Sequence, residues 1–251
     1  MTVYQIFTGV NPGGAEVVMF NHMRLMPKKY HFVVLVERKD TSFFDSMLCD
    51  NIEIVVIGSY CSLWYIRNLV KLFYFSRDAI VHSHVNVKSI IPLFIAKLFG
   101  VKTRILHSHI NLRPINLSKL VSSVGFYEEF KVLIKTILVP YAKHMSTINL
   151  ACGVDAGRWM FSDTKFNVFR NAIEFNKFRF DLDNRNRYRL ELGLGNDDLL
   201  IGHVGRFYEQ KNHTFMIDIT KRMLDNGVNF KMIFIGSGDL IQSVNERIAL
   251  L

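Results

Sequence analysis

Two short loops of this sequence carry residue types that bind phosphate groups. The first, residues 9–16, places adjacent glycines, Gly13 and Gly14, between an apolar run and an amphipathic stretch. Adjacent glycines let a ligand approach the backbone closely, and the free amides at a helix start favour an anion. The loop matches neither the G-x-G-x-x-G dinucleotide fingerprint nor the Walker P-loop, so an ordinary strand-to-helix turn is the alternative.

The second loop, residues 204–212, holds two cationic side chains, Arg206 and Lys211. Gly205 ends the preceding apolar run, and Asn212 is of a type that often caps a helix. A forked guanidinium, a point-charge ammonium and free helix amides together suit a diphosphate. The alternative interpretation is a solvated basic loop.

Four histidines occur in two near-identical triplets, each at the end of an expected strand. The triplets are His82-Ser83-His84 and His107-Ser108-His109. Residues two apart share one face of a strand, and ligands of open α/β sheets lie beyond the carboxyl ends of the strands, so four imidazoles could lie together. We favour one catalytic or substrate-orienting histidine supported by the others. A metal site is disfavoured because no Asp, Glu or Cys accompanies them at ligand spacing, and simple burial is the alternative for His82 and His107.

A glycine turn, Gly236-Ser237-Gly238, follows another apolar run and precedes a helix that begins near Asp239. Its position beyond a strand end suits the phosphate, ribose or base of a nucleotide.

Two segments combine basic and aromatic residues, at residues 63–75 and 119–143. Apolar insertion and Lys/Arg attraction could hold either one on an anionic membrane surface. Packing of a helix on a sheet is the favoured interpretation for the first segment. For the second segment both interpretations stay open.

Short apolar runs alternate with amphipathic stretches along the chain, which is typical of βαβ units and a parallel sheet. The expected strands are 3–7, 31–36, 52–57, 79–82, 103–107, 145–149, 167–169, 199–204 and 230–235. The expected helices are 15–26, 41–49, 63–75, 87–99, 128–142, 156–161 and 212–225, with a short one ending at Gly193 and a last one from Asp239.

A polar, charge-dense segment, residues 181–189, separates two such patterns and is interpreted as a joint. The sequence therefore predicts an α/β protein with two Rossmann-like, doubly wound domains. We place the N-terminal domain at residues 1–176, and the linker with the first part of a second domain at residues 177–251. Only two strands follow the joint, whereas such sheets have about 5–6, so we expect the second domain to be incomplete.

Composition limits the kind of partner. Of the 251 residues 49% are hydrophobic, which predicts a globular chain. There are 31 Lys+Arg and 22 Asp+Glu, for a net charge of +9. This excess of basic residues suggests an anionic partner: nucleotide phosphate, nucleic acid or a membrane surface. No apolar run approaches the ~18 residues of a membrane span, and the N-terminus lacks a signal-peptide pattern. Scattered Cys49, Cys61 and Cys152 fit a reducing cytoplasm.

The order of the motifs resembles the GT-B retaining glycosyltransferases of family 4, most closely those of bacterial capsule and exopolysaccharide clusters. The motifs are GGAE, D-A-I-V-H-S-H, R-I-L-H-S-H, F-R-N-A-I, G-R-F-Y-E-Q-K-N-H and G-S-G-D-L, which together cover essentially the entire chain. The G-R-x-x-E-Q-K-N segment is the most specific of them.

The resemblance implies an acceptor-side domain facing a nucleotide-sugar domain across a cleft. Arg206 and Lys211 would hold the donor diphosphate, and Gly13 and Gly14 would reach toward the same phosphates. His109 would be the active-site histidine that contacts the transferred sugar or orients the acceptor. The nucleotide would lie near three further glycines, Gly205, Gly236 and Gly238. No metal or other cofactor is expected, because basic side chains and helix dipoles neutralise the leaving diphosphate.

The predicted function is therefore transfer of a sugar, with retention, from a nucleotide sugar (UDP by default) to a growing, lipid-linked cell-surface glycan. The expected location is the cytoplasm, at the inner face of the membrane. The family's later acidic E-x7-E segment is absent from the sequence, so the alternative is a truncated, non-catalytic remnant that lacks half of the donor site. Nucleic-acid binding has no recognised motif here, and a nicotinamide dehydrogenase would need the missing glycine fingerprint.

Overall fold

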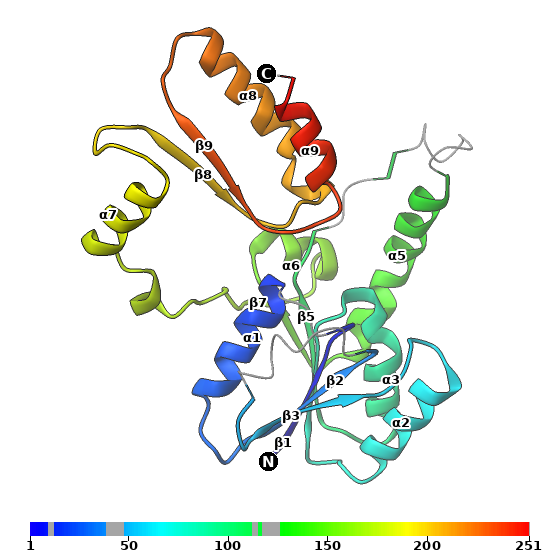
Figure 1. Ribbon diagram of the computed structural model, residues 1–251. Helices are drawn as coiled ribbons and strands as arrows, with labels where there is room; N and C mark the ends of the chain where they lie inside the picture. Colours follow the sequence, from blue (N-terminus) through cyan, green and yellow to red (C-terminus); the bar gives the residue numbers. More distant parts are fainter. Residues whose placement is uncertain (10–12, 39–47, 112–114, 117–125, 251) are drawn as a thin grey trace. The chain divides into compact units, whose positions relative to one another are not determined.

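The structure is a computed structural model (Figure 1), and it describes residues 1–9, 13–38, 48–111, 115–116 and 126–250. Contacts within the chain divide it into two compact units. The first unit is Met1–Phe175 and the second is Asn176–Leu251.

The first unit is built on a seven-stranded sheet in which every neighbouring pair is parallel. In chain order the strands are β1 (Thr2–Ile6), β2 (His31–Val36), β3 (Ile52–Val56), β4 (Ile80–Ser83), β5 (Thr103–Ser108), β6 (Ile148–Ala151) and β7 (Asn167–Val168). Their spatial order, β3-β2-β1-β4-β5-β6-β7, reverses direction between β1 and β4. The predicted doubly wound α/β class is confirmed, and the reversal creates a switch point where ligands of such sheets bind.

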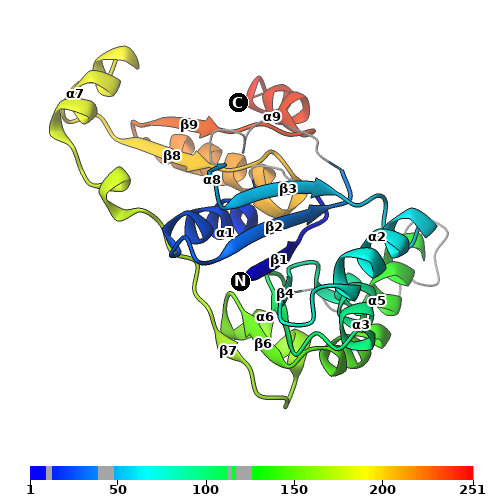
Figure 2. The ribbon, with the colours of Figure 1, turned by 90° about the horizontal axis from the view of Figure 1, so that it is seen from below.

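Helices cover both faces of this sheet (Figures 1 and 2). They are α1 (Gly14–Leu25), α2 (Leu63–Tyr74), the 3-10 turn η2 (Asn86–Ser89), α3 (Ile90–Leu98), α5 (Phe126–Met145) and α6 (Val154–Phe161). Helix α1 lies on one face, and α2, α3, α5 and α6 pack on the other. The helix predicted at residues 41–49 falls largely outside the described residues.

Alternating side chains of the central strands supply two separate apolar cores. Phe32 and Val34 of β2 face α1, where Phe20 is fully buried, whereas Val33 and Leu35 face the opposite group of helices. Because helices cover both faces of the sheet, the sequence of β2 is a continuous apolar run rather than an alternation of apolar and polar residues.

The second unit contains a two-stranded parallel sheet with helices packed against it. Its elements are the 3-10 turn η3 (Phe175–Phe178, which begins at the boundary), α7 (Leu182–Glu191), β8 (Leu200–Val204), the 3-10 turn η4 (Glu209–Lys211), α8 (His213–Asp225), β9 (Lys231–Ile235) and α9 (Ile241–Ile248). Its small core is centred on Phe207, Ile217 and Val244.

Two expected elements differ from those observed. The strand predicted at 145–149 lies at Ile148–Ala151, because α5 continues to Met145 and ends where the Ser146 hydroxyl donates to the Lys143 carbonyl oxygen at 2.9 Å. The short helix expected to end at Gly193 begins earlier than the sequence indicated, within the charge-dense segment 181–189. The Asp181 carboxylate accepts a hydrogen bond from the Asn184 amide at 2.7 Å, which caps α7, so most of the segment is helical.

Two leucines of α2 give a matched test of this packing. Leu69 is fully buried, whereas Leu63 is 88% exposed. Replacing Leu69 by Ala should lower the free energy of unfolding of the first unit by about 2–5 kcal/mol, because the vacated volume is not refilled. Leu63→Ala should change it by no more than about 0.5 kcal/mol. Urea unfolding followed by tryptophan fluorescence reports on this unit alone, since both tryptophans, Trp64 and Trp159, belong to it. Equal losses for the two variants would contradict the assignment of the core.

Candidate functional site

The four histidines gather at the carboxyl edge of the sheet, beside the switch point. Parallel pairing places His82 of β4 opposite Gln5 of β1 and Ile105 of β5. His84 lies just beyond β4, His107 is the penultimate residue of β5, and His109 directly follows that strand. The ring centroids of His82 and His84 lie 4.1 Å apart, those of His84 and His109 5.1 Å, and those of His107 and His109 4.0 Å.

A chain of hydrogen bonds fixes which ring nitrogens carry protons. His84 Nε2 lies 2.6 Å from Gln5 Oε1, and an amide oxygen can only accept, so His84 Nε2 is the donor. His84 Nδ1 is therefore an acceptor in the neutral ring, and it accepts a hydrogen bond of 2.8 Å from the N–H of His109 Nε2. It follows that His109 keeps an unprotonated Nδ1, which can accept a hydrogen bond from a hydroxyl.

Burial keeps these imidazoles neutral. It lowers the pKa of His109 to about 4 and, together with the neighbouring rings, lowers the pKa of His82 to about 3 and that of His107 to about 2. The pKa of His84 falls well below its ordinary value for the same two reasons, burial first. At neutral pH each ring therefore presents one N–H and one lone pair, as the hydrogen-bond chain requires.

Aromatic rings enclose the cluster. Phe7 stacks on His84, with ring centroids 4.3 Å apart and an angle of 6° between the ring planes. Phe169 contacts His107 edge-on, with ring centroids 5.7 Å apart. His82 and His107 are buried and share a hydrogen bond of 3.2 Å between Nε2 and Nδ1. The second nitrogen of His107, Nε2, is buried with no hydrogen-bond partner among the described residues.

Three of these histidines could in principle hold a metal ion. Ring nitrogens of His82, His84 and His107 lie within 4.8 Å of one another. Over the described part of the chain this group contains histidines alone. His82 Nε2 and His107 Nδ1 already bond to each other, and both nitrogens of His84 bond to Gln5 and His109. The expectation that the protein works without a metal stays a prediction.

In the second unit, the loop between β8 and α8 carries the two predicted phosphate ligands. The Arg206 guanidinium lies 5.0 Å above the Tyr208 ring, beside a polar cavity of about 340 Å³ that Glu209 and Gln210 also line. The Lys211 side chain runs alongside Gly205, its Cε 3.5 Å from where a Cβ would stand at that position. Both cations are exposed, and no described carboxylate forms an ion pair with either of them.

The predicted glycine turn after β9 packs directly on this loop. Gly236 and Gly238 have φ angles of +154° and +150°, which disfavour any other residue. A methyl group on Gly236 would overlap the Gly205 carbonyl oxygen, and one on Gly238 would lie 2.6 Å from the Phe207 carbonyl oxygen. The Phe207 amide donates to the Ser237 carbonyl at 2.8 Å. The turn and the loop therefore form one rigid piece of backbone.

The adjacent glycines of the first unit lie at the start of α1. Gly13 is the N-cap residue, without a side-chain cap, and its carbonyl accepts from the Val17 amide at 3.0 Å. The carboxylate of Glu16 lies against Gly13, whereas nothing lies within 4 Å of a Cβ built on Gly14. Gly14 therefore leaves open space beside the helix start, as a close ligand approach requires. Residues 10–12 of the same loop lie outside the described residues.

Comparison with solved structures identifies the class of fold. The neighbours include GT-B glycosyltransferases, and the chain has a GT-B fold over the length that it shares with them. Anabaena HepE, solved in complex with UDP-glucose, matches with a TM-score of 0.75 at 15% identity over 100% of this chain and 66% of that chain. A glycosyltransferase from Rickettsia africae ESF-5 matches with a TM-score of 0.62 at 12% identity, over 99% of this chain and 65% of that chain.

Sequence comparison agrees with the fold. The chain is 28% identical to the putative glycosyltransferase EpsF of Bacillus subtilis (strain 168), over 98% of its own length and 64% of that protein. A segment covering 30% of the chain is 36% identical to the capsular polysaccharide biosynthesis glycosyltransferase CapM of Staphylococcus aureus, over 20% of that protein. No model of a known protein family matches. The chain thus spans slightly less than two thirds of EpsF and HepE.

The structure adds one residue that the motifs did not reveal. Gln5 is 3% exposed and ends the histidine chain. A polar residue in the middle of the apolar run 3–7 was the available signal, because a buried amide needs a partner.

Removing the Gln5 carbonyl tests the proton arrangement. Gln5→Met keeps the side-chain length but leaves the His84 N–H without its acceptor, so the tautomer of His84, and through it that of His109, should no longer be fixed. Long-range ¹H–¹⁵N NMR should show His109 entirely in the Nε2–H form in the unaltered protein and a mixture in the variant. Gln242→Met, at an exposed position of α9, is the control. An unchanged His109 spectrum in Gln5→Met would refute the chain of hydrogen bonds.

Proposed function

We propose that this chain carries out glycosyl transfer with retention, from a UDP-sugar to a growing cell-surface glycan. The observation that carries the proposal is a rigid loop that contains two cations, Arg206 and Lys211. Neither cation forms an ion pair with a carboxylate of the described residues. The names of the relatives support it, since HepE was solved with UDP-glucose and CapM is a capsular polysaccharide biosynthesis glycosyltransferase.

The second unit would bind the donor through its backbone turn and its two cations. The Arg206 fork can contact two diphosphate oxygens at once, and Lys211 adds a compact positive charge. Gly205, Gly236 and Gly238 keep side chains away from the place assigned to the nucleotide. Charge that develops on the departing diphosphate is thereby stabilised without a metal ion.

The first unit would position the acceptor and the transferred sugar. His109 is neutral, and its free Nδ1 can accept a hydrogen bond from a sugar hydroxyl. The lowered pKa of His109 makes this lone pair a weak base and a weak nucleophile, so we assign it an orienting role. Gly13 and Gly14 would let the donor phosphates approach the start of α1.

The outer surface of α5 supports contact with a membrane and hence a lipid-linked acceptor. Phe130, Ile134, Ile137 and Tyr141 recur at three- and four-residue spacing, and each is between 40% and 58% exposed. Two lysines flank this stripe, at positions 131 and 143. Exposed apolar side chains bordered by lysines suit the surface of anionic lipids at the cytoplasmic face. None of the helices in the described residues is both long and apolar enough to cross a bilayer.

Donor binding can be measured by calorimetry with UDP and UDP-glucose. Arg206→Ala and Lys211→Ala should each weaken binding by roughly 10- to 100-fold, the effect of losing a hydrogen bond to a charged group. Lys221→Ala, an exposed lysine of α8, should bind like the unaltered chain.

Unchanged affinity in both loop variants would exclude the diphosphate assignment. A turnover assay on the same samples distinguishes an active glycosyltransferase from the truncated, non-catalytic remnant. Donor binding without sugar transfer to any lipid-linked acceptor would favour the non-catalytic alternative.

Membrane contact can be tested by sedimentation with vesicles. The double variant Ile137→Ser/Tyr141→Ser should bind phosphatidylglycerol-containing vesicles at least tenfold more weakly, because each side chain contributes roughly 1.5–3 kcal/mol when fully buried. Phe215→Ser, at a position of the second unit that is 57% exposed, is the matched control. Equal binding of the two variants would rule out the α5 stripe as the contact.

A further inference from the structure

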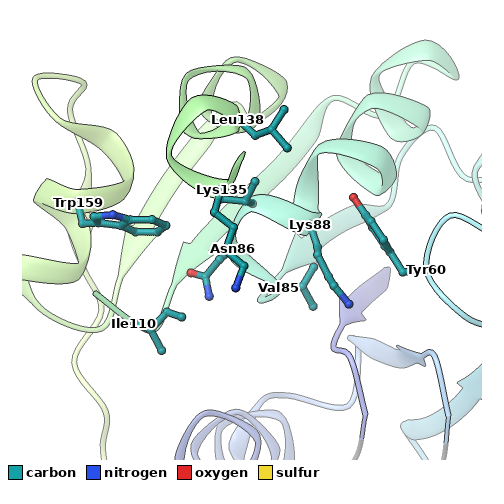
Figure 3. Close-up of a pocket in the computed structure, with 9 residues that line it drawn as sticks. Tyr60, Val85, Asn86, Lys88, Ile110, Lys135, Leu138 and Trp159 are labelled. Carbon is teal, nitrogen blue, oxygen red and sulfur yellow. The ribbon is translucent and has the colours of Figure 1, made fainter. Parts of the chain in front are cut away.

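A separate cavity lies in the first unit, on the sheet face covered by α2, α3, α5 and α6 (Figure 3). Its volume is about 230 Å³, below the ~300–1,000 Å³ of pockets for drug-sized ligands, so it suits a single small ring. Val85 and Asn86 come directly after His84, and Ile110 comes directly after His109. The cavity therefore shares the carboxyl edge of β4 and β5 with the histidine cluster.

The walls of the cavity are largely apolar and aromatic. Trp159 of α6 and Tyr60, which precedes α2, approach it from opposite sides, and Leu138 of α5 lies between them (Figure 3). Burial raises the pKa of the Tyr60 phenol, which keeps it uncharged. Flat apolar rings pack well against the C–H faces of a sugar, and a few polar groups then set its orientation.

A buried amide oxygen in this cavity lacks a partner. Asn86 Oδ1 is shielded from solvent and forms no hydrogen bond to the residues that the structure describes. The backbone of Asn86 is in the left-handed region, with φ +50°, at the start of η2. A buried acceptor without a donor is costly. Rotation of the Asn86 amide would bring this oxygen to the cavity, where a hydroxyl or amide group of a ligand could donate to it.

The charge of the cavity is positive. The Lys88 ammonium is paired with the Glu37 carboxylate at 3.1 Å and lies 5.0 Å above the Tyr60 ring. Lys135, on α5, has no ion pair with any described residue, and its side chain extends toward Asn86 (Figure 3). One uncompensated ammonium beside an unsatisfied amide suits a ligand that carries both hydroxyl groups and a negative charge.

We propose that this cavity binds one negatively charged sugar residue, a uronate or a sugar phosphate, with its ring against Trp159 and its anionic group at Lys135. We assign this sugar to the acceptor, and that assignment rests on the glycosyltransferase function proposed above. The binding step itself needs neither a donor nor turnover.

Tryptophan fluorescence can test the proposal directly. The chain has two tryptophans, so Trp64→Phe leaves Trp159 as the only reporter. In this background we expect saturable changes in Trp159 emission on titration with glucuronate or glucose 6-phosphate, and binding of glucose at least tenfold weaker. A response to only one of the two anionic sugars identifies whether the group is a carboxylate or a phosphate.

Two lysines of α5 provide the matched variants. Lys135→Met should weaken binding of the anionic sugar about tenfold or more, and Lys131→Met, whose ammonium pairs with Glu128 at 2.7 Å outside the cavity, should leave it unchanged. Asn86→Gly, which suits the left-handed backbone, should also weaken it. The proposal is overturned if no sugar gives a saturable change, if glucose binds as well as glucuronate, or if inorganic phosphate competes as well as glucose 6-phosphate. UDP affinity, measured on the same proteins, reports separately on the donor site.

Discussion

The parallel pairing of β4 with β1 and β5 constrains everything at the carboxyl edge of the first sheet. It places His82 beside Gln5 and brings two H-S-H triplets from different strands into one cluster. Because the rings are buried together, they must be neutral, and a neutral imidazole can donate only once. A single amide oxygen, Gln5 Oε1, then determines the direction of hydrogen bonding as far as His109. The pairing of the strands therefore determines that His109 Nδ1 is the unprotonated nitrogen of its ring.

The second unit reaches rigidity by a different route. Its sheet has two strands, and its loops are held by backbone contacts rather than by a large core. The glycine turn fits against the loop of Arg206 and Lys211 so closely that side chains are excluded at Gly236 and Gly238. Long, exposed cationic side chains are flexible, and a fixed loop limits the entropy lost when they bind an anion.

Much of the fold could be predicted from the sequence. The strand 31–36 has the predicted bounds, because a continuous β-branched and aromatic run is unambiguous when both faces are buried. The strand at 148–151 was misplaced, since apolar periodicity does not show where α5 ends and β6 begins. Alternation in strands correctly brought the four histidines together. No motif encodes side-chain packing or backbone angles. Three features therefore could not be predicted: the direction of the histidine hydrogen bonds, the contact between the loop and the glycine turn, and the left-handed backbone of Asn86. The roles of the site residues stay predictions.

The hydrogen-bonded histidine chain also restricts how this protein can evolve. Both ring nitrogens of His84 are hydrogen-bonded, one to Gln5 and one to His109, so a change at one of these positions alters which residues are acceptable at the next. An apolar replacement of His84 would leave the amide oxygen of Gln5 and the N–H of His109 unsatisfied in a dry interior. Substitutions at these three positions are therefore tolerated as matched sets rather than one at a time. We expect sequence drift on this edge of the sheet to be slow for reasons of internal polarity alone.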